Sequence, residues 1–302
     1  MKLLDLSLGN PSFLQEKWNQ SNFVLENLDM SYKGARKGFN SLTEGIRLLH
    51  KKYNNCKISE NSHIVITVGA SQAVQACLYA QKKIKKSKHV YCPTPYWKRF
   101  DDFFEMTGVE TAEEENSGFV LRTSPNNPDG VHTDWFCHIR DACYNWPQYG
   151  VDPICFKDEM ILFSLAKMSG HASTRIGWIV TENEELAKEA QNYVNMATLG
   201  VSLESQYVAS FIIEQVLKTN FLSENKNILK QRRLLLFKAL EASSCKIKIL
   251  SEQGMFWYIE CHQDLLNQLN VTGTNCGENL FRLNIACSSE DFQELTNRIY
   301  SL

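Results

Sequence analysis

Residues 163–180 decide the fold and read Phe163-Ser-Leu-Ala-Lys-Met-Ser-Gly-His-Ala-Ser-Thr-Arg-Ile-Gly-Trp-Ile-Val180. An apolar run leads into this stretch from Met160, and a second apolar run, Ile176–Val180, ends it. Two apolar runs separated by a polar segment predict a strand, a loop and a second strand. The polar groups of the stretch are therefore expected in the loop.

The predicted loop contains Lys167 among small and apolar residues. Loss of solvation lowers the pKa of such an amine and makes it nucleophilic toward a carbonyl. Ser164, three residues earlier, and Arg175, eight residues later, could hold a phosphate. The alternative is a buried strand pair whose lysine extends its amine to solvent.

This loop resembles the cofactor loop of fold-type I pyridoxal-phosphate enzymes. It is most similar to the branch that holds plant tryptophan aminotransferases and the catalytic domain of alliinases. That family usually reads Ser-Lys-x-x-Gly-His-Ala-Gly-x-Arg-x-Gly-Trp, whereas here Ser164 is separated from Lys167 and Ser173 replaces the second glycine. Other members also have serine three residues before the lysine. The resemblance implies that Lys167 holds pyridoxal 5′-phosphate as a Schiff base and that Ser164 and Arg175 bind its phosphate.

Composition places the chain among ordinary globular proteins. It has 302 residues, of which 43% are apolar and 22% charged, and a net charge of −2 gives no reason to expect a nucleic-acid partner. Because no apolar run reaches about 18 residues and Met1–Asp5 is interrupted by charge, we expect neither a membrane span nor a signal peptide. Ten scattered cysteines with no metal-ligand spacing predict reduced thiols, a cytoplasmic protein and no metal site.

A glycine turn follows the apolar strand predicted at His63–Val68. A strand, a glycine and a helix start form a phosphate cradle, because the helix N-terminus carries partial positive charge. This signal is weak by itself. The resemblance adds that the family often reads Gly-Ser-Thr-Gln where this chain has Gly69, Ala70, Ser71 and Gln72, which implies phosphate binding by these four residues.

Two aromatic residues follow the next predicted strand, Lys88–Cys92, in the segment Pro93-Thr94-Pro95-Tyr96-Trp97. The two prolines predict a rigid turn, and a flat ring there could stack on a cofactor ring. The alternative is an aromatic pair buried in the core. The register of the family implies that Trp97 stacks and that Tyr96 packs behind it.

Residues 124–130, Ser-Pro-Asn-Asn-Pro-Asp-Gly, follow a strand predicted at Gly118–Thr123 and match the family motif completely. The resemblance implies that Asn127 hydrogen-bonds the 3′-oxygen of the cofactor and contacts the substrate.

A further strand is predicted at Trp135–Arg140, followed by Asp141. A buried aspartate there needs a positive partner, which a pyridinium N–H supplies; the alternative is a helix N-cap. The family pattern Asp-x-Ala-Tyr has Cys143 in place of its alanine here. The resemblance implies that Tyr144 also contacts the 3′-oxygen.

The two ends of the chain carry weaker signals. Asn10 stands where the family has an acid, so no role is assigned to it. Tyr32 is the candidate for a phosphate contact in the partner subunit, although a solvated loop tyrosine explains it equally well. Arg282, in a predicted strand Phe281–Ala286, needs an anion if it is buried, and the resemblance implies the α-carboxylate of the substrate.

The remaining segments are expected to be ordinary helices and strands. Helices are predicted over Ser41–Tyr53, from Ala70 to about Lys83, after Glu185 to about Met196, over Ser205–Lys218 and over residues 224–242. A strand is predicted over Gly254–Glu260. Ser288 and Asp291 predict the N-terminal cap of a last helix. We expect the basic side chains of residues 224–242 to be solvated surface; these are Lys230, Arg232, Arg233 and Lys238.

Five chemically complementary groups thus follow five predicted strand ends, where ligands bind in open α/β sheets. We expect an α/β fold of the fold-type I class. Residues 31–215 would form a three-layer large domain with a mostly parallel sheet, and residues 1–30 and 216–302 a small α+β domain. The resemblance implies an aminotransferase acting on an L-amino acid, possibly aromatic, and a 2-oxo acid, as a homodimer. The alternatives are an alliinase-type C–S lyase, whose relatives are secreted and carry a cysteine-rich module, and a non-catalytic sensor that keeps the cofactor.

Overall fold

The structure is a computed structural model that describes residues 3–7, 12–15, 36, 38–150, 152–244, 246–251 and 253–302. Asn10 and Tyr32 lie outside the described residues.

A seven-stranded sheet forms the larger part of the molecule, with strand order β2-β8-β7-β6-β5-β3-β4. Its strands are β2 (His63–Val68), β3 (His89–Tyr91), β4 (Glu110–Thr111), β5 (Phe119–Thr123), β6 (Ile139–Asp141), β7 (Met160–Ser164) and β8 (Ile176–Thr181). Strand β8 runs antiparallel to both of its neighbours, and every other neighbouring pair is parallel. The prediction of a mostly parallel sheet is confirmed.

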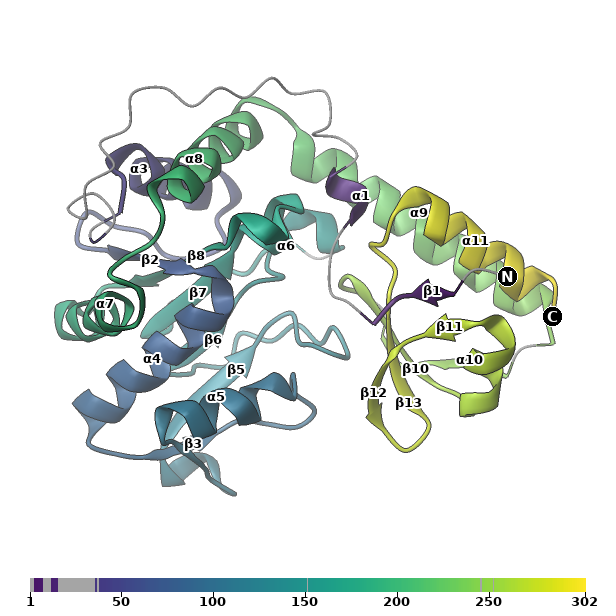
Figure 1. Cartoon of the computed structure of the whole chain (residues 1–302), viewed down its shortest axis with the longest axis horizontal. Helices are drawn as coiled ribbons and strands as arrows, with labels where there is room; N and C mark the ends of the chain where they lie inside the picture. The colour runs from purple at the N-terminus through teal and green to yellow at the C-terminus, as the bar shows by residue number, and fades with distance from the viewer. Residues whose placement is uncertain are drawn as a thin grey trace.

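Helices cover both faces of this sheet (Figure 1). They are α3 (Asn40–Tyr53), α4 (Gly69–Lys85), α5 (Arg99–Thr107), α7 (Glu184–Thr198) and α8 (Leu203–Lys218). Neighbouring residues of a strand point to opposite faces. On β8, Trp178 bonds His50 of α3, whereas Gly177 lies against the start of α4. Helices α3 and α4 therefore lie on opposite faces, and the three-layer arrangement is confirmed.

The smaller part of the molecule carries an antiparallel sheet and both chain ends (Figure 1). Its four-stranded sheet, in the order β12-β13-β10-β9, consists of β9 (Lys248–Ile249), β10 (Phe256–Glu260), β12 (Thr274–Gly277) and β13 (Leu280–Asn284). Strand β1 (Leu4–Asp5) pairs with β11 (Val271–Thr272). The helices are α1 (Ser12–Gln15), α9 (Phe221–Ala242), α10 (Gln263–Leu269) and α11 (Ser289–Tyr300). Ser288 caps α11 as predicted, because its hydroxyl accepts from the backbone N–H of Asp291.

Two hydrophobic cores divide the chain. The larger surrounds the seven-stranded sheet, and the smaller packs between the four-stranded sheet and helices α10 and α11. Helix α9 belongs to both, since Leu229 packs in the larger core and Leu236 in the smaller. The domain boundaries at residues 31 and 215 stay a prediction.

Two local predictions were wrong. Lys167 lies in a short helix, α6 (Leu165–Ser169), rather than in a loop. The strand expected from Trp135 begins only at Ile139, because side chains bond the preceding backbone. Asp158 accepts from the Cys137 backbone N–H at 2.7 Å, and the Trp135 carbonyl accepts from Arg140.

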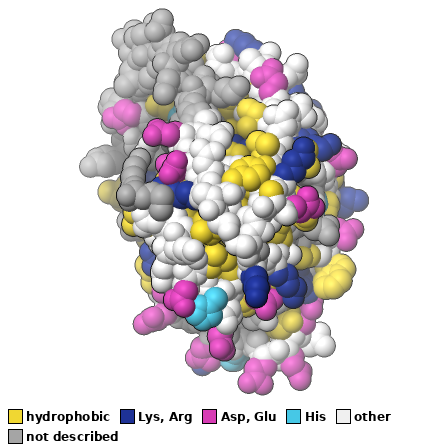
Figure 2. All heavy atoms as spheres, turned by 90° about the vertical axis from the view of Figure 1, so that its right-hand side faces the viewer, with side chains coloured by type: hydrophobic (Ala, Val, Ile, Leu, Met, Phe, Trp, Pro, Cys, Tyr) yellow, Lys and Arg dark blue, Asp and Glu magenta, His cyan; other side chains and the backbone are white. Residues whose placement is uncertain are grey.

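The solvated basic surface expected on α9 was also partly wrong. Arg232 is buried, and Arg233 donates to the carbonyl oxygen of Gly254. Lys230 and Lys238 are exposed as expected. In Figure 2, which faces the smaller part of the molecule, Lys and Arg atoms alternate with Asp and Glu atoms over the described surface. This face therefore carries no broad basic field.

Within the described ranges, none of the helices combines the length and the apolar character that crossing a membrane requires.

Candidate active site

Four of the five predicted groups line one cavity of about 180 Å³ at the carboxyl ends of the parallel strands; these are Trp97, Asn127, Asp141 and Lys167. The fifth, Gly69, does not line it, but Ala70 and Ser71, which follow Gly69, do. Ser71 follows β2, Trp97 follows β3, Asn127 follows β5, Asp141 ends β6 and Lys167 follows β7. Strand β2 is parallel to β7, because each is antiparallel to β8, so all five ends lie at one edge of the sheet. The cavity is lined by Ala70, Ser71, Trp97, Asn127, Asp141, Cys143, Tyr144, Ser164, Ala166, Lys167, Ala172, Arg175, Phe256 and Arg282.

Lys167 is held through its backbone. Its carbonyl oxygen accepts hydrogen bonds from the Tyr149 hydroxyl at 2.6 Å and from Nε2 of Gln148 at 3.3 Å. Desolvation lowers the pKa of Lys167 from its ordinary value to about 8, and the positive charges of Arg282 and Arg175 act in the same direction. The amine is therefore partly unprotonated near neutral pH.

Asp141 is a buried carboxyl at the end of β6. Burial raises its pKa, and a hydrogen bond from Cys143 and the charge of Lys167 offset only part of that effect. Its Oδ1 accepts from the backbone N–H of Cys143 at 3.0 Å. No helix starts at Asp141, so the helix N-cap alternative is wrong. A cationic N–H facing this carboxyl would stabilise its ionised form.

Asn127 links Tyr144 to Arg282. Its Nδ2 donates to the Tyr144 hydroxyl at 3.2 Å, and its Oδ1 accepts from Nη1 of Arg282 at 2.7 Å. The other terminal nitrogen of Arg282 donates to the Ser7 carbonyl at 3.1 Å and to the Thr274 hydroxyl at 3.0 Å. The guanidinium of Arg282 is thus buried and fixed, with its Nε the one nitrogen that bonds no described residue.

Two glycines allow Arg175 to approach the start of α4. Gly69 has φ +68°, and a Cβ there would lie 2.4 Å from a guanidinium nitrogen of Arg175. A Cβ on Gly177 would lie 2.6 Å from the Gly69 carbonyl carbon. Ser164 occupies the N-cap position of α6, but its side chain makes no capping hydrogen bond. This end of the cavity therefore combines a helix N-terminus, a guanidinium and a hydroxyl, a set that suits a phosphate.

Of the remaining predicted site residues, some line the cavity and others do not. Trp97 lines the cavity. Tyr96 packs on the ring of Phe100, with 6.2 Å between the ring centroids. That Tyr96 packs behind Trp97 stays a prediction. The Gln72 side chain does not line the cavity, because its Oε1 accepts from the Val68 N–H at 2.8 Å and its Nε2 donates to Thr198 at 3.3 Å.

Sequence reasoning missed four residues of the site. Tyr149 and Gln148 carried no sequence signal, because they contact Lys167 only through tertiary structure. Phe256 lies on β10, and its ring centroid is 4.3 Å from the Arg282 guanidinium. Cys143 was visible only as a departure from the family pattern.

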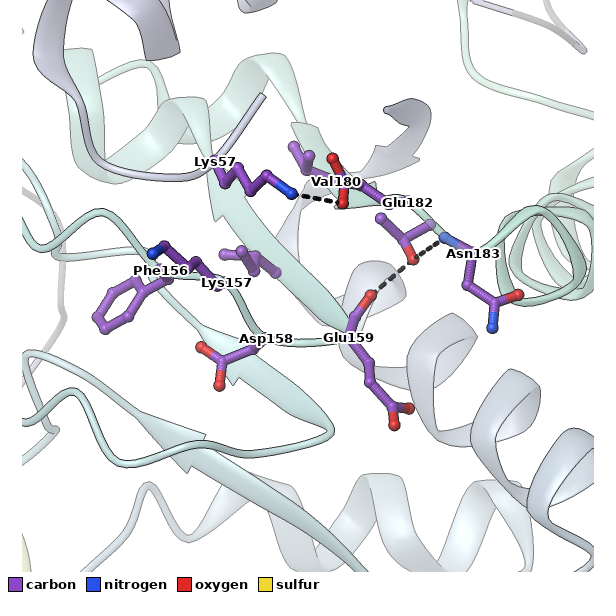
Figure 3. A pocket seen from close by; sticks show the side chains of 10 residues that line it. Lys57, Phe156, Lys157, Asp158, Glu159, Val180, Glu182 and Asn183 are labelled. Atoms are coloured by element: carbon purple, nitrogen blue, oxygen red, sulfur yellow. Dashed lines mark hydrogen bonds and ion pairs between the residues drawn. The ribbon is translucent and has the colours of Figure 1, made fainter. Parts of the chain in front are cut away.

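A second hollow, of about 420 Å³, lies at the opposite edge of the sheet (Figure 3). Several of its charged groups bond neighbouring protein groups. Lys57 pairs with Glu182 at 2.9 Å, as Figure 3 shows. Asp158 pairs with the buried Arg140 at 2.9 Å. Because this hollow lies away from the carboxyl ends of the parallel strands, the smaller cavity is the candidate active site.

Comparisons with known proteins agree with this geometry. The allinase family profile, Alliinase_C, matches residues 4–234. Tryptophan aminotransferase-related protein 2 of Arabidopsis thaliana is 27% identical over 242 residues, which cover 71% of this chain and 55% of that protein. Alliin lyase of Allium cepa var. aggregatum is 27% identical over 245 residues, covering 70% and 54%. The chain spans about half the length of these curated relatives.

Solved structures show the fold. A methionine aminotransferase of Escherichia coli superposes with a TM-score of 0.76 at 17% identity, covering 99% of this chain and 94% of that one. Aspartate aminotransferase of Thermotoga maritima gives a TM-score of 0.75 at 16% identity, covering 99% and 92%. The fold is therefore that of fold-type I aminotransferases, as predicted.

Proposed function

The chain belongs to the allinase family, and we propose that it is an aminotransferase that moves an amino group from an L-amino acid to a 2-oxo acid. The allinase and aminotransferase families depend on pyridoxal phosphate. The observation that carries the proposal is that Lys167, Asp141 and Arg282 line one cavity. These are an amine, a carboxyl and a guanidinium.

The residues of the cavity fit pyridoxal phosphate. When bound, this cofactor supplies an electron sink that stabilises negative charge at the Cα atom of the substrate. Gly69 lets the guanidinium of Arg175 lie against the N-terminus of α4, so that these two positive groups would hold the phosphate together, and Asp141 needs the cationic partner that a ring N–H provides. The residues that would hold the cofactor are Gly69, Ala70, Ser71, Trp97, Asn127, Asp141, Tyr144, Ser164, Lys167 and Arg175.

Lys167 would move the proton of the reaction. Because its pKa is lowered to about 8, a useful fraction of the amine is unprotonated near neutral pH. Its Nζ can then accept the proton from Cα of the bound amino acid. Tyr149 and Gln148 hold the Lys167 carbonyl and so restrict where the amine can reach.

Arg282 would bind the α-carboxylate of the substrate. Its guanidinium is already fixed by Asn127, Ser7 and Thr274, so little order is lost on binding. Asn127 and Tyr144, bonded to each other, would orient the 3′-oxygen of the cofactor.

A lyase is the second candidate, because alliin lyases are as similar to this chain as the aminotransferase-related proteins. Both reactions begin with proton removal from Cα by Lys167 and then diverge. A lyase expels a group from Cβ and releases pyruvate, whereas an aminotransferase needs a 2-oxo acid to complete its cycle. The aminotransferase-related relatives favour transamination and weakly favour an aromatic donor.

A substrate panel tests this choice. Purified protein with bound cofactor is mixed with L-amino acids, and the absorbance change to the amine form of the cofactor is followed, with 2-oxoglutarate or pyruvate added as acceptor. We expect an aromatic or other large L-amino acid to give the amine form and its 2-oxo acid. The proposal is lost if S-alkyl-cysteine sulfoxides release pyruvate without an acceptor while no donor gives the amine form. A sensor would give neither product.

We also keep the homodimer and the cytoplasmic location as proposals, which size determination in solution and cell fractionation test.

A further inference from the structure

A separate cavity, of about 290 Å³, lies near the active site and shares no lining residue with it. It is lined by residues 92–96, which follow β3, by the end of β5 and by the segment that follows β5 up to Trp135. Asn126 joins these two walls, because its Nδ2 donates to the carbonyl oxygen of Pro95 at 2.8 Å. Residues 94–96 separate the cavity from a hollow of about 430 Å³ that adjoins the active site.

Most of the surface of this cavity is apolar. Tyr96 and Trp135 contribute aromatic rings, and Pro93, Pro95 and Val131 contribute aliphatic groups. Trp135 is 66% exposed, so its ring is open to contact from outside the folded chain. A largely apolar cavity with an accessible indole and a few polar groups is typical of a site for a small planar molecule.

Arg122 contributes a buried guanidinium to the same cavity. Its Cζ lies 5.6 Å from the centroid of the Trp135 ring. Of its three nitrogens only Nη2 bonds a described residue, Glu115, at 2.6 Å, and the side chain of Glu115 is 50% exposed. Arg140, the register partner of Arg122 on β6, instead pairs with the buried Asp158. Arg122 therefore keeps N–H groups that can donate to a ligand.

Asp129 supplies an acceptor in the same cavity. Its Oδ1 accepts from Nδ2 of Asn126 at 2.9 Å and from the Val131 backbone N–H at 3.0 Å, whereas its Oδ2 accepts from no described residue. The charged residues among the described lining residues are Arg122 and Asp129, and their charges are opposite. The cavity thus favours neither an anion nor a cation, and it offers both a donor and an acceptor.

We propose that this cavity is a second ligand site, which binds a small, uncharged aromatic carboxamide. The ring of the ligand lies against Trp135, its carbonyl oxygen accepts from Arg122, and its amide N–H donates to Asp129. A carboxamide is planar and carries a donor and an acceptor side by side. A carboxylate would instead place a negative charge near Asp129, and an ammonium would place a positive charge near Arg122. The inference does not depend on the proposed function, because the two cavities share no lining residue.

Ligand-observed NMR titration of the protein with bound cofactor tests this site, with benzamide as the probe. Cyclohexanecarboxamide lacks the aromatic ring, and methyl benzoate keeps the ring and the carbonyl but lacks the N–H donor. We expect benzamide to bind about fivefold more tightly than either of them. Trp135→Leu and Arg122→Met should each weaken benzamide binding by a similar factor, and Trp135→Leu should change cyclohexanecarboxamide binding less than twofold.

Phe136→Leu is the matched control. Phe136 is the next residue after Trp135 and is similarly exposed, at 58%, but it does not line the cavity, so this variant should bind benzamide like the wild type. Because Trp135 is exposed, Trp135→Leu decides the question if Arg122→Met does not fold. Equal affinity of the wild type for the three probes, or no binding of benzamide, overturns the inference. Unchanged benzamide affinity in Trp135→Leu, or an equal loss in Phe136→Leu, also overturns it, because the probe would then bind elsewhere.

Discussion

At the level of single residues, Lys167 shows how the site sets its chemistry. The charge of Asp141 favours the protonated amine, whereas desolvation opposes it and is the largest effect. The result is a pKa of about 8 for Lys167. A lysine on the surface would stay protonated at neutral pH and could not act as a base.

Lys167→Ala is therefore expected to lose the covalent attachment of the cofactor. Borohydride treatment of the wild type, followed by digestion and mass spectrometry, should find the added mass on the peptide that contains Lys167. The variant should carry none, while Lys57→Ala, at the opposite edge of the sheet, should label like the wild type. Added mass on a different lysine would show that Lys167 is not the residue that holds the cofactor.

Asp141→Ala should keep the fold and lose most turnover, with kcat falling at least about a hundredfold, or about 2.7 kcal/mol. An unprotonated ring nitrogen withdraws electrons poorly from Cα.

The same variant should also affect stability. Burial raises the pKa of Asp141, so in the cofactor-free chain this carboxyl destabilises the fold once the pH exceeds the ordinary pKa of an aspartate. The variant should thus unfold no more easily than the wild type without cofactor at pH 7, and near-normal kcat would remove Asp141 from the mechanism.

Most of the candidate site residues could be predicted from the sequence because each lies within a short motif that follows a strand. Asn127 lies in a seven-residue match, and Asp141 and Tyr144 in a spaced pattern. Tyr149 and Gln148 could not be predicted, since they lie 18 and 19 residues before Lys167 and meet its carbonyl only after folding.

At the level of elements, buried polar contacts explain where sequence patterns failed. The pattern at Trp135–Arg140 reads as a strand, yet Asp158 and Arg140 bond its first backbone groups and pairing begins at Ile139. Periodicity records side-chain character and carries no information about which distant carboxylate will reach a backbone N–H.

Helix α3 is joined to β8 through a buried histidine. Trp178 Nε1 donates to His50 Nε2 at 2.9 Å, which makes Nε2 an acceptor. His50 Nδ1 must therefore donate to Asn55 Oδ1, at 2.6 Å. These two bonds fix one neutral tautomer, and burial lowers the pKa of His50 to about 4.

This histidine should make folding stability depend on pH. Between pH 6.5 and about 4 the unfolded chain binds a proton at His50 that the folded chain does not, so stability falls as pH falls. The full loss from this group is about 3 kcal/mol. Urea unfolding at several pH values should show a steeper decline for the wild type than for His50→Gln. Parallel declines would mean that another group causes the acid sensitivity.

At the level of the whole molecule, the three layers and the mostly parallel sheet could be predicted, but the junction between the two cores could not. Helix α9 looks amphipathic, with basic residues that suggest a solvated face. In the folded chain Arg232 turns inward and donates to the carbonyl oxygens of Ile285, at 3.0 Å, and Cys287, at 2.7 Å. It also lies over the rings of Phe13 and Phe292.

Arg232 therefore ties helices α1, α9 and α11 to the end of β13, the strand that carries Arg282. Arg232→Met keeps much of the apolar packing but leaves two buried carbonyls without their donor, which should cost about 3 kcal/mol of unfolding free energy. Lysine cannot reproduce the fork of a guanidinium, so Arg232→Lys should recover only part of that loss. Lys230→Met, at an exposed position on the same helix, is the matched control and should stay within about 0.5 kcal/mol of the wild type.

Urea unfolding of the three variants measures these differences in unfolding free energy. Because β13 also positions Arg282, Arg232→Met should weaken binding of the amino-acid substrate at temperatures where the chain is still folded. A variant as stable as the wild type would show that packing of α9 alone, without its buried arginine, holds the two cores together.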